Sequence, residues 1–247
     1  MATLTHIFRH PIKSHGREQL EKVTLSAGKT MPFDRKWAVA HDAAKADGSV
    51  WAPCQNFSRG AKTGSLQAID ATLDEGAGEI TLTHPKLGEI SFRPDDNPSE
   101  FLDWIMPIMD PNRALPERII AVPDRGMTDT DYPSISLNNL ASHKALEGHF
   151  GQALTFQRWR GNLWFEGLEA WEEEAWIGKR LRLGSAEFEI RESIVRCLAT
   201  TIDTTTGVRD VDTLSALDAM RGAKIFGTYA EIVKSGEISL GDTLEVL

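Results

Sequence analysis

The sequence predicts a mainly β protein with a few helices, built as one or two β-barrel or sandwich units. Most of its apolar stretches alternate with polar residues at a period of two, which is the spacing of strands. Only three stretches carry apolar residues at helical spacing. The chain has 247 residues, of which 41% are hydrophobic, so it can bury a substantial core.

The strands are expected at five places. Residues 34–42 alternate around a tryptophan and a valine. Residues 79–84 and 89–94 flank the turn sequence PKLG and predict a hairpin, and a Gly-Ser turn within residues 179–193 predicts a second hairpin. Residues 236–247 predict two short strands around a Gly-Asp turn.

Three helices are expected. Residues 98–109 begin with Ser99 as the N-terminal cap and contain Pro107, which limits the helix. Residues 136–151 predict a longer helix that ends at a glycine, and residues 212–222 predict a third, short helix.

One domain boundary is expected. The loosest part of the chain is the stretch 109–133, which is rich in Pro, Asp and Arg. We therefore place the boundary near residue 115, with one unit over residues 1–115 and a second unit over residues 116–247.

Composition narrows the class of protein. The formal net charge of −9 argues against binding of nucleic acid, which needs a basic surface. No apolar run approaches the roughly 18–20 residues that cross a membrane, and the N-terminus lacks the order of a signal peptide. We expect a cytoplasmic protein without a membrane span. Its two cysteines, Cys54 and Cys197, are then expected to be reduced, and neither belongs to a CxxC metal motif.

Cys197 is the first candidate for chemistry. It lies in the stretch SIVRCLATTID, directly after Arg196. A neighbouring guanidinium and nearby hydroxyl or backbone donors favour the thiolate, which binds metals or attacks substrates. No histidine lies near it in the sequence to act as the base of a nucleophilic cysteine. Three interpretations remain open on these grounds: a small buried core residue, a nucleophile and a metal ligand.

A second candidate is the basic stretch RHPIKSHGR at residues 9–17. It is either a solvated turn or an anion site. In an anion site, Lys13 supplies a point charge, while Ser14 and the loop amides donate hydrogen bonds to a phosphate. The stretch lacks the glycines of a P-loop.

A third candidate is the stretch FQRWRGNLWFEG at residues 156–167. Arg158, Arg160 and Asn162 are two residues apart, so in a strand they share a face that clamps a phosphate or reads the edge of a heterocycle. The aromatic residues of this stretch are expected to pack in the core.

The remaining polar stretches suggest less. Residues 169–176, EAWEEEAW, are expected to form an exposed acidic segment with packed tryptophans. His143 and His149 are expected on a helix surface. Cys54 is expected to be structural, with a role near the site left open.

Together these stretches resemble the MOSC superfamily, named for its similarity to the C-terminal part of molybdenum cofactor sulfurases. They are most similar to members with an N-terminal MOSC-associated β-barrel domain, a group that includes the mitochondrial amidoxime-reducing component and its bacterial relatives. The opening HPIKSHGREQLEKVTL and DRKWAVAHD resemble that N-terminal domain. The MOSC domain itself is resembled, in order and spacing, by SISLNNL, RWRGNLWFEG, EEEAWIGKRLRLGSAEFEI, VRCLATTIDTTTGVRD and GEISLGDTLEV. The resemblance implies a MOSC-type β-barrel plus a smaller N-terminal β-barrel.

The resemblance also implies a cofactor and the residues that hold it. In the family, a cysteine thiolate ligates a molybdenum ion that the dithiolene of a molybdopterin also holds, and the matching residue here is Cys197. A serine that starts the family's helix matches Ser136. The full set of matched or adjacent cofactor-binding positions is Lys13, Ser14, Arg35, Ser136, Arg160, Asn162, Arg196 and Thr200.

The implied activity is that of a molybdenum-dependent oxidoreductase that reduces N-hydroxylated small molecules such as amidoximes, hydroxylamines or N-hydroxylated bases. The chain ends at DTLEVL without the ferredoxin-like extension of some bacterial relatives, so electrons are expected from a separate ferredoxin, flavoprotein or cytochrome. The alternative is a protein that carries the molybdenum cofactor, or sulfur as a persulfide on Cys197, without reducing anything. A cofactor-free interaction module with an inert core cysteine is the third hypothesis.

Overall fold

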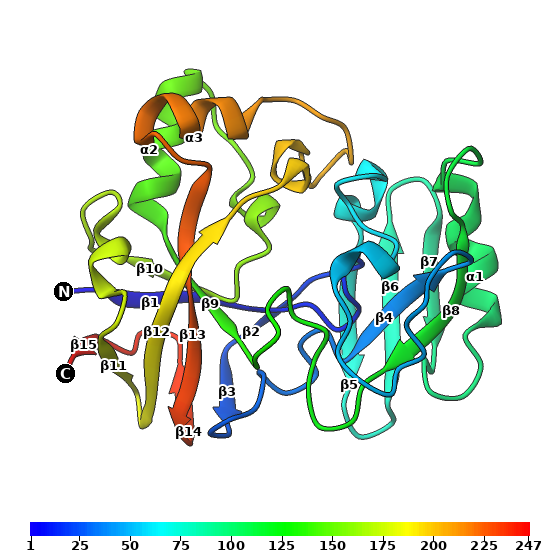
Figure 1. Ribbon diagram of the computed structural model, residues 1–247, viewed down its shortest axis with the longest axis horizontal. Helices are drawn as coiled ribbons and strands as arrows, with labels where there is room; N and C mark the ends of the chain where they lie inside the picture. The colour runs from blue at the N-terminus through cyan, green and yellow to red at the C-terminus, as the bar shows by residue number, and fades with distance from the viewer.

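The computed structural model describes residues 1–247, and the chain forms two halves that lie side by side (Figure 1). It contains fifteen strands, three α-helices and six short 3-10 helices. The predicted mainly β class with a few helices is therefore confirmed. No helix combines the length and the hydrophobicity needed to cross a bilayer.

The larger half is built on a curled sheet of eight strands in the order β15-β11-β12-β13-β9-β10-β1-β2 (Figure 1). In chain order these strands are β1 (Thr3–Arg9), β2 (Glu18–Leu20), β9 (Ile135–Asn139), β10 (Leu163–Glu166), β11 (Arg180–Leu183), β12 (Ala186–Val195), β13 (Ile225–Lys234) and β15 (Leu244–Val246). Strands β9 and β10 run parallel, and the other neighbours run antiparallel. A separate two-stranded ribbon joins β3 (Lys22–Leu25) to β14 (Gly236–Ser239).

Alternating burial along the strands makes the core of this half. In β11 the two arginines are exposed, while Leu181 and Leu183 are fully buried. These leucines pack with Phe188 and Ile190 of β12 in a cluster of 20 buried residues. The pairing of β11 with β12 confirms the hairpin predicted over residues 179–193.

The smaller half contains two further sheets. One pairs β4 (Trp37–His41) with β8 (Pro116–Ala121), and the other is the meander of β5 (Asp70–Asp74), β6 (Glu79–His84) and β7 (Gly88–Phe92). The pairing of β6 with β7 confirms the first predicted hairpin. This half also holds α1 (Ser99–Ile105) and three 3-10 helices: η1 (Cys54–Asn56), η2 (Gly64–Ala68) and η3 (Met106–Ile108).

Helices α2 (Leu140–Phe150) and α3 (Thr213–Arg221) cover one end of the large sheet (Figure 1). Each has a side-chain cap at its start, Asn139 for α2 and Asp212 for α3, and each ends at a left-handed glycine. The larger half also carries three 3-10 helices: η4 (Phe156–Trp159), η5 (Glu172–Trp176) and η6 (Leu198–Thr201).

Two predicted element boundaries are wrong. The helix expected from residue 136 begins at Leu140, because residues 135–139 extend as β9 between β13 and β10. The two short strands predicted over residues 236–247 are confirmed as β14 and β15, which pair with different partners: β14 pairs with β3, and β15 pairs with β11. Ser99 is the first helical residue of α1 rather than its cap, and its N–H donates to the side chain of Asn97.

Two surface predictions are also wrong. His143 is buried rather than exposed. Both of its ring nitrogens have partners inside the protein: one accepts a hydrogen bond from the indole N–H of Trp159, and the other lies 3.0 Å from the Leu154 carbonyl oxygen. Glu173, in the segment expected to be exposed, is fully buried. Its carboxylate accepts from Asn139 and Ser142 at the start of α2, and burial raises its pKa.

The two halves are not consecutive in the sequence. Strands β1 and β3 pair with strands beyond residue 115, while β8 pairs with β4 of the smaller half. The chain thus crosses between the halves more than once. The boundary near residue 115 stays a prediction.

Candidate functional site

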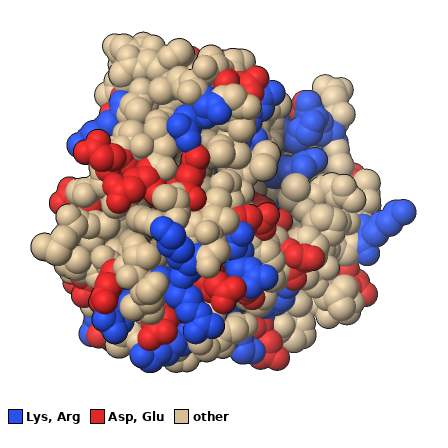
Figure 2. Space-filling model, turned by 60° about the vertical axis from the view of Figure 1, so that its left-hand side comes forward, with Lys and Arg blue, Asp and Glu red and all other residues tan.

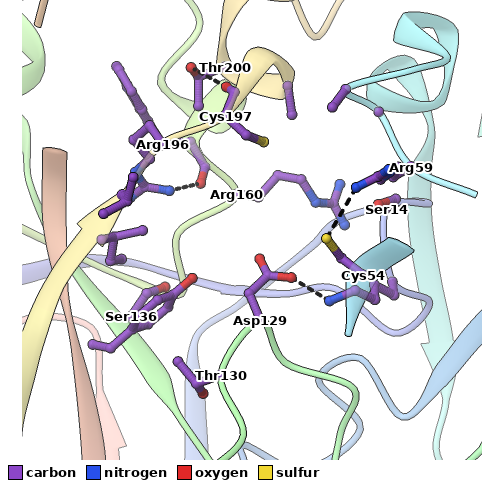
Figure 3. A pocket seen from close by; sticks show the side chains of 18 of the residues that line it. Ser14, Cys54, Arg59, Asp129, Thr130, Ser136, Arg160, Arg196, Cys197 and Thr200 are labelled. Carbon is purple, nitrogen blue, oxygen red and sulfur yellow. Dashed lines mark hydrogen bonds and ion pairs between the residues drawn. The ribbon is translucent and has the colours of Figure 1, made fainter. Parts of the chain in front are cut away.

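A cavity of about 410 Å³ opens where the two halves meet (Figure 3). Loops of both halves line it, including those before β4 and around η1 on one side and those around η4 and η6 on the other. Eight of the nine residues predicted for the cofactor site line it: Lys13, Ser14, Arg35, Ser136, Arg160, Arg196, Cys197 and Thr200.

Cys197 is exposed, and its sulfur faces this cavity (Figure 3). Strand β12 ends at Val195, and η6 begins at Leu198, so the cysteine lies in the short turn between them. Its carbonyl oxygen accepts hydrogen bonds from both the N–H and the hydroxyl of Thr200, each at 3.1 Å. The backbone is therefore fixed while the thiol is free. The interpretation of Cys197 as a buried core residue is wrong.

The cavity carries an excess of positive charge, from six cationic side chains against two carboxylates. Lys13 is buried, and its ammonium pairs with Asp129 and donates to the Met127 carbonyl at 2.8 Å. Arg35 pairs with Asp34. The charges of these two cations are partly neutralised by the neighbouring carboxylates.

Arg160 and Arg196, by contrast, have no carboxylate within ion-pair distance. Arg160 donates to the Gly16 carbonyl at 3.1 Å, and Arg196 donates to the carbonyls of Trp159 and Phe226, each at 2.8 Å. Burial and then the charge of Arg35 lower the pKa of Arg160 to about 9, and burial lowers the pKa of Arg196 to about 10. Both groups remain charged at neutral pH. The cavity is thus prepared for a negatively charged ligand.

The backbone is strained at three cavity residues. Ser14, Arg35 and Arg160 have φ angles of 66°, 53° and 49°, in the left-handed region that residues with a side chain rarely adopt. Such strain costs free energy and gathers where a site requires a fixed orientation. The next position, Gly161, has no room for a side chain, because a Cβ there would lie 2.1 Å from the side-chain amide nitrogen of Asn138. The three polar side chains are therefore aimed by their backbone.

Residues 125–245 match the family model described as the MOSC domain. This part of the chain is a MOSC domain. Relatives include mitochondrial amidoxime reducing component 2 of Homo sapiens, 29% identical over 124 residues, covering 45% of this chain and 36% of that protein. The same component of Macaca fascicularis is 28% identical over 152 residues, covering 56% of this chain and 41% of that protein. The chain thus spans less than half the length of these curated relatives.

Among solved structures, the YUAD protein of Bacillus subtilis superposes with a TM-score of 0.50. The superposition covers 100% of this chain and 96% of that one at 12% sequence identity. At this identity the likeness shows the fold alone. Lys13, Ser14 and Arg35 lie before the matched MOSC range, so the cavity is shared between the MOSC domain and the residues that precede it.

Ser136 and Asn162 occupy other places in the MOSC domain than the sequence predicts. Ser136 lies on β9 rather than at the start of a helix, and its hydroxyl reaches the cavity. Asn162 is buried beneath the main cavity and lines a small void beside it. Its side-chain oxygen accepts hydrogen bonds from the hydroxyl (2.9 Å) and the N–H (3.2 Å) of Ser136. Asn162 therefore positions Ser136 instead of facing the main cavity.

The predicted shared strand face of Arg158, Arg160 and Asn162 is wrong. Residues 156–159 form η4, and the chain then turns at Arg160. Arg158 lines the cavity, but its buried guanidinium donates to both carboxylate oxygens of Asp210, at 2.9 and 2.8 Å. That pair holds the loops together and leaves Arg160 as the arginine of this stretch that faces the cavity without a carboxylate.

Sequence reasoning missed several residues that line the cavity: Arg59, Asp129, Glu192 and Tyr229. Asp129 lies in a loop that no pattern singles out, and the charges of Lys13 and Arg35 lower its pKa to about 2 against the opposing effect of burial. Cys54 also lines the cavity, across from Cys197 (Figure 3). A basic residue five positions after a cysteine was the one available signal for Arg59.

Proposed function

We propose that the cavity binds a molybdenum cofactor and that the protein uses it to reduce small N-hydroxylated compounds. The observation that carries the proposal is the thiol of Cys197, exposed to a cavity in which Arg160 and Arg196 have no carboxylate partner. Membership of the MOSC family supports the cofactor, and the name of the amidoxime reducing component relatives supports the reaction class.

The side chains of the cavity fit such a cofactor in charge and in chemistry. A thiolate is a soft anionic ligand of the kind that transition metals accept. The guanidinium of Arg160 matches the phosphate of a molybdopterin, because it offers parallel N–H groups to two phosphate oxygens. The cavity volume of about 410 Å³ lies within the range typical of small-molecule sites.

The proposed roles divide by chemistry. Cys197 is the protein ligand of the metal. The groups that hold the phosphate and pterin are Lys13, Ser14, Arg35 and Arg160, and the polar groups that shape the cavity around them are Ser136, Asn162, Arg196 and Thr200. When bound, the cofactor supplies two-electron redox chemistry, and the protein supplies binding, orientation and charge compensation.

The proposed substrates are amidoximes, hydroxylamines or N-hydroxylated bases. In their reduction the N–O bond breaks, two electrons and two protons are taken up, and the oxygen leaves as water. The electrons come from a separate donor of the ferredoxin, flavoprotein or cytochrome type. We also propose that the chain acts in the cytoplasm.

The test is anaerobic assay of the purified protein with benzamidoxime and reduced methyl viologen, together with elemental analysis. We expect close to one molybdenum per chain and formation of benzamidine, with both lost in Cys197→Ser. Bound molybdenum or sulfane sulfur without turnover would instead identify a carrier. The proposal would be refuted if the wild type held neither metal nor sulfane sulfur and if Cys197→Ser matched it in every measurement.

A further inference from the structure

Arg59 is the cation of the cavity that neither the family resemblance nor the ion pairs account for. It lies on the segment that follows η1, in the half opposite Cys197 (Figure 3). Its one side-chain hydrogen bond goes to the sulfur of Cys54 at 3.3 Å, and no carboxylate lies within ion-pair distance of it. A thiol compensates a guanidinium poorly, so this charge is available to a ligand.

The segment that carries Arg59 is held in place on both sides. Just before it, Phe57 is buried, and the N–H of Ser58 donates to the Val39 carbonyl at 2.9 Å. Just after it, the N–H groups of Lys62 and Thr63 both donate to the Arg59 carbonyl at 3.0 Å. The guanidinium therefore extends from a fixed backbone.

A smaller cavity of about 170 Å³ adjoins this position, and Arg59 lines both cavities. Its walls hold polar groups without partners. Ser58 is only 6% exposed, and its buried hydroxyl has no hydrogen-bond partner. The Nδ1 atom of His41 is likewise buried without a partner. Lys62 lines the same cavity without an ion pair. Buried polar groups are rarely left unsatisfied, so these groups indicate a polar ligand.

We infer that Arg59, Lys62 and Ser58 form a subsite for a negatively charged substituent, so that the protein prefers N-hydroxylated substrates that carry a carboxylate. This inference rests on the proposed function and names the substrate class within it. The cations Lys13, Arg35, Arg160 and Arg196 are assigned above to the cofactor site. Arg59 comes from the half opposite Cys197 and has no role there, so it can hold the far end of a substrate.

The test compares benzamidoxime with 4-carboxybenzamidoxime on the molybdenum-loaded protein, with reduced methyl viologen as the electron source. We expect the wild type to have the higher kcat/KM for the carboxylated compound. A hydrogen bond between charged groups is worth a factor of about 10 to 100, so Arg59→Gln should reduce the ratio of the two kcat/KM values by about that much. Arg59→Lys should keep most of the preference, because the charge remains.

The matched control is Arg93→Gln, which removes an exposed arginine from the same half and should leave the ratio unchanged. Equal kcat/KM values in the wild type, or an unchanged ratio in Arg59→Gln, would overturn the inference. Calorimetric binding of the two compounds separates this outcome from failure of the proposed function. Tighter binding of the carboxylated compound, lost in Arg59→Gln, supports the subsite even without turnover, and equal binding overturns it.

Discussion

Removing the guanidinium of Arg158 tests how the thiol-bearing loop is held. Arg158 is fully buried, and besides its two hydrogen bonds to Asp210 it donates to the carbonyls of Thr155 (3.0 Å) and Thr200 (3.3 Å). Thr200 in turn fixes the carbonyl of Cys197. Arg158 therefore ties η4 to the loop that presents the sulfur, and we expect Arg158→Gln to destabilise the whole protein.

The magnitude follows from the burial of the pair. Removing one partner of a buried ion pair costs about 3–5 kcal/mol, because the other charge is left uncompensated. The side chain of Asp210 is 30% exposed, so water compensates part of this loss. We expect the free energy of unfolding to fall by about 2–3 kcal/mol, and Tm by about 4–12 °C for a chain of this size.

Urea unfolding followed by circular dichroism measures this change. The control is Arg180→Gln, whose exposed arginine lies 3.8 Å from Glu189 and whose loss should cost less than about 1 kcal/mol. If Arg158→Gln lost no more stability than the control, the buried pair would not hold the loop and the reasoning would be wrong.

Three further outcomes are expected. Cys197→Ser should purify without molybdenum and with the Tm of the cofactor-free wild type, since the exposed thiol packs against no core; metal retained at the wild-type level would contradict its role as ligand. Arg160→Gln should lower the fraction of chains that keep the pterin through gel filtration in phosphate buffer, measured by fluorescence after oxidation; equal retention would remove Arg160 from the phosphate site. The lowered pKa of Asp129 implies stabilisation by Lys13 that is present above about pH 4 and lost as the pH falls through about 2. Asp129→Asn should therefore weaken the fall of Tm between those pH values, and an identical fall in both proteins would count against the ion pair.

The parts of the fold that the sequence predicts well are those set by local patterns. The hairpin of β11 and β12 follows from Leu181 and Leu183 on one face and a Gly-Ser turn. Helix α3 follows from the Asp212 cap and the left-handed Gly222. In each case neighbours within a few residues decide the conformation, so the sequence carries the information directly.

The candidate site depends on contacts that are distant in the sequence. The spacing of Arg158 and Arg160 suggests a strand. In the structure Arg158 lies in the 3-10 helix η4, where it pairs with Asp210, 52 residues later, and the chain turns at Arg160, so the two arginines have different partners. His143 has an ordinary helix-surface position in the pattern, but Trp159 and the Leu154 carbonyl supply its buried hydrogen bonds. Local periodicity does not predict such partners. The resemblance to a family, rather than the pattern, identified the residues that meet in the cavity.

The cavity lies between the two halves, so its positive charges affect the stability of the folded protein. Arg35 and Arg160 come from different halves and repel each other, which contributes to the lowered pKa of Arg160. Folding brings these like charges together, so the site works against the stability of the protein, as functional sites commonly do. An anion that binds between them offsets this repulsion and favours the folded state. Binding of the proposed cofactor should therefore stabilise the contact between the halves as well as fill the cavity.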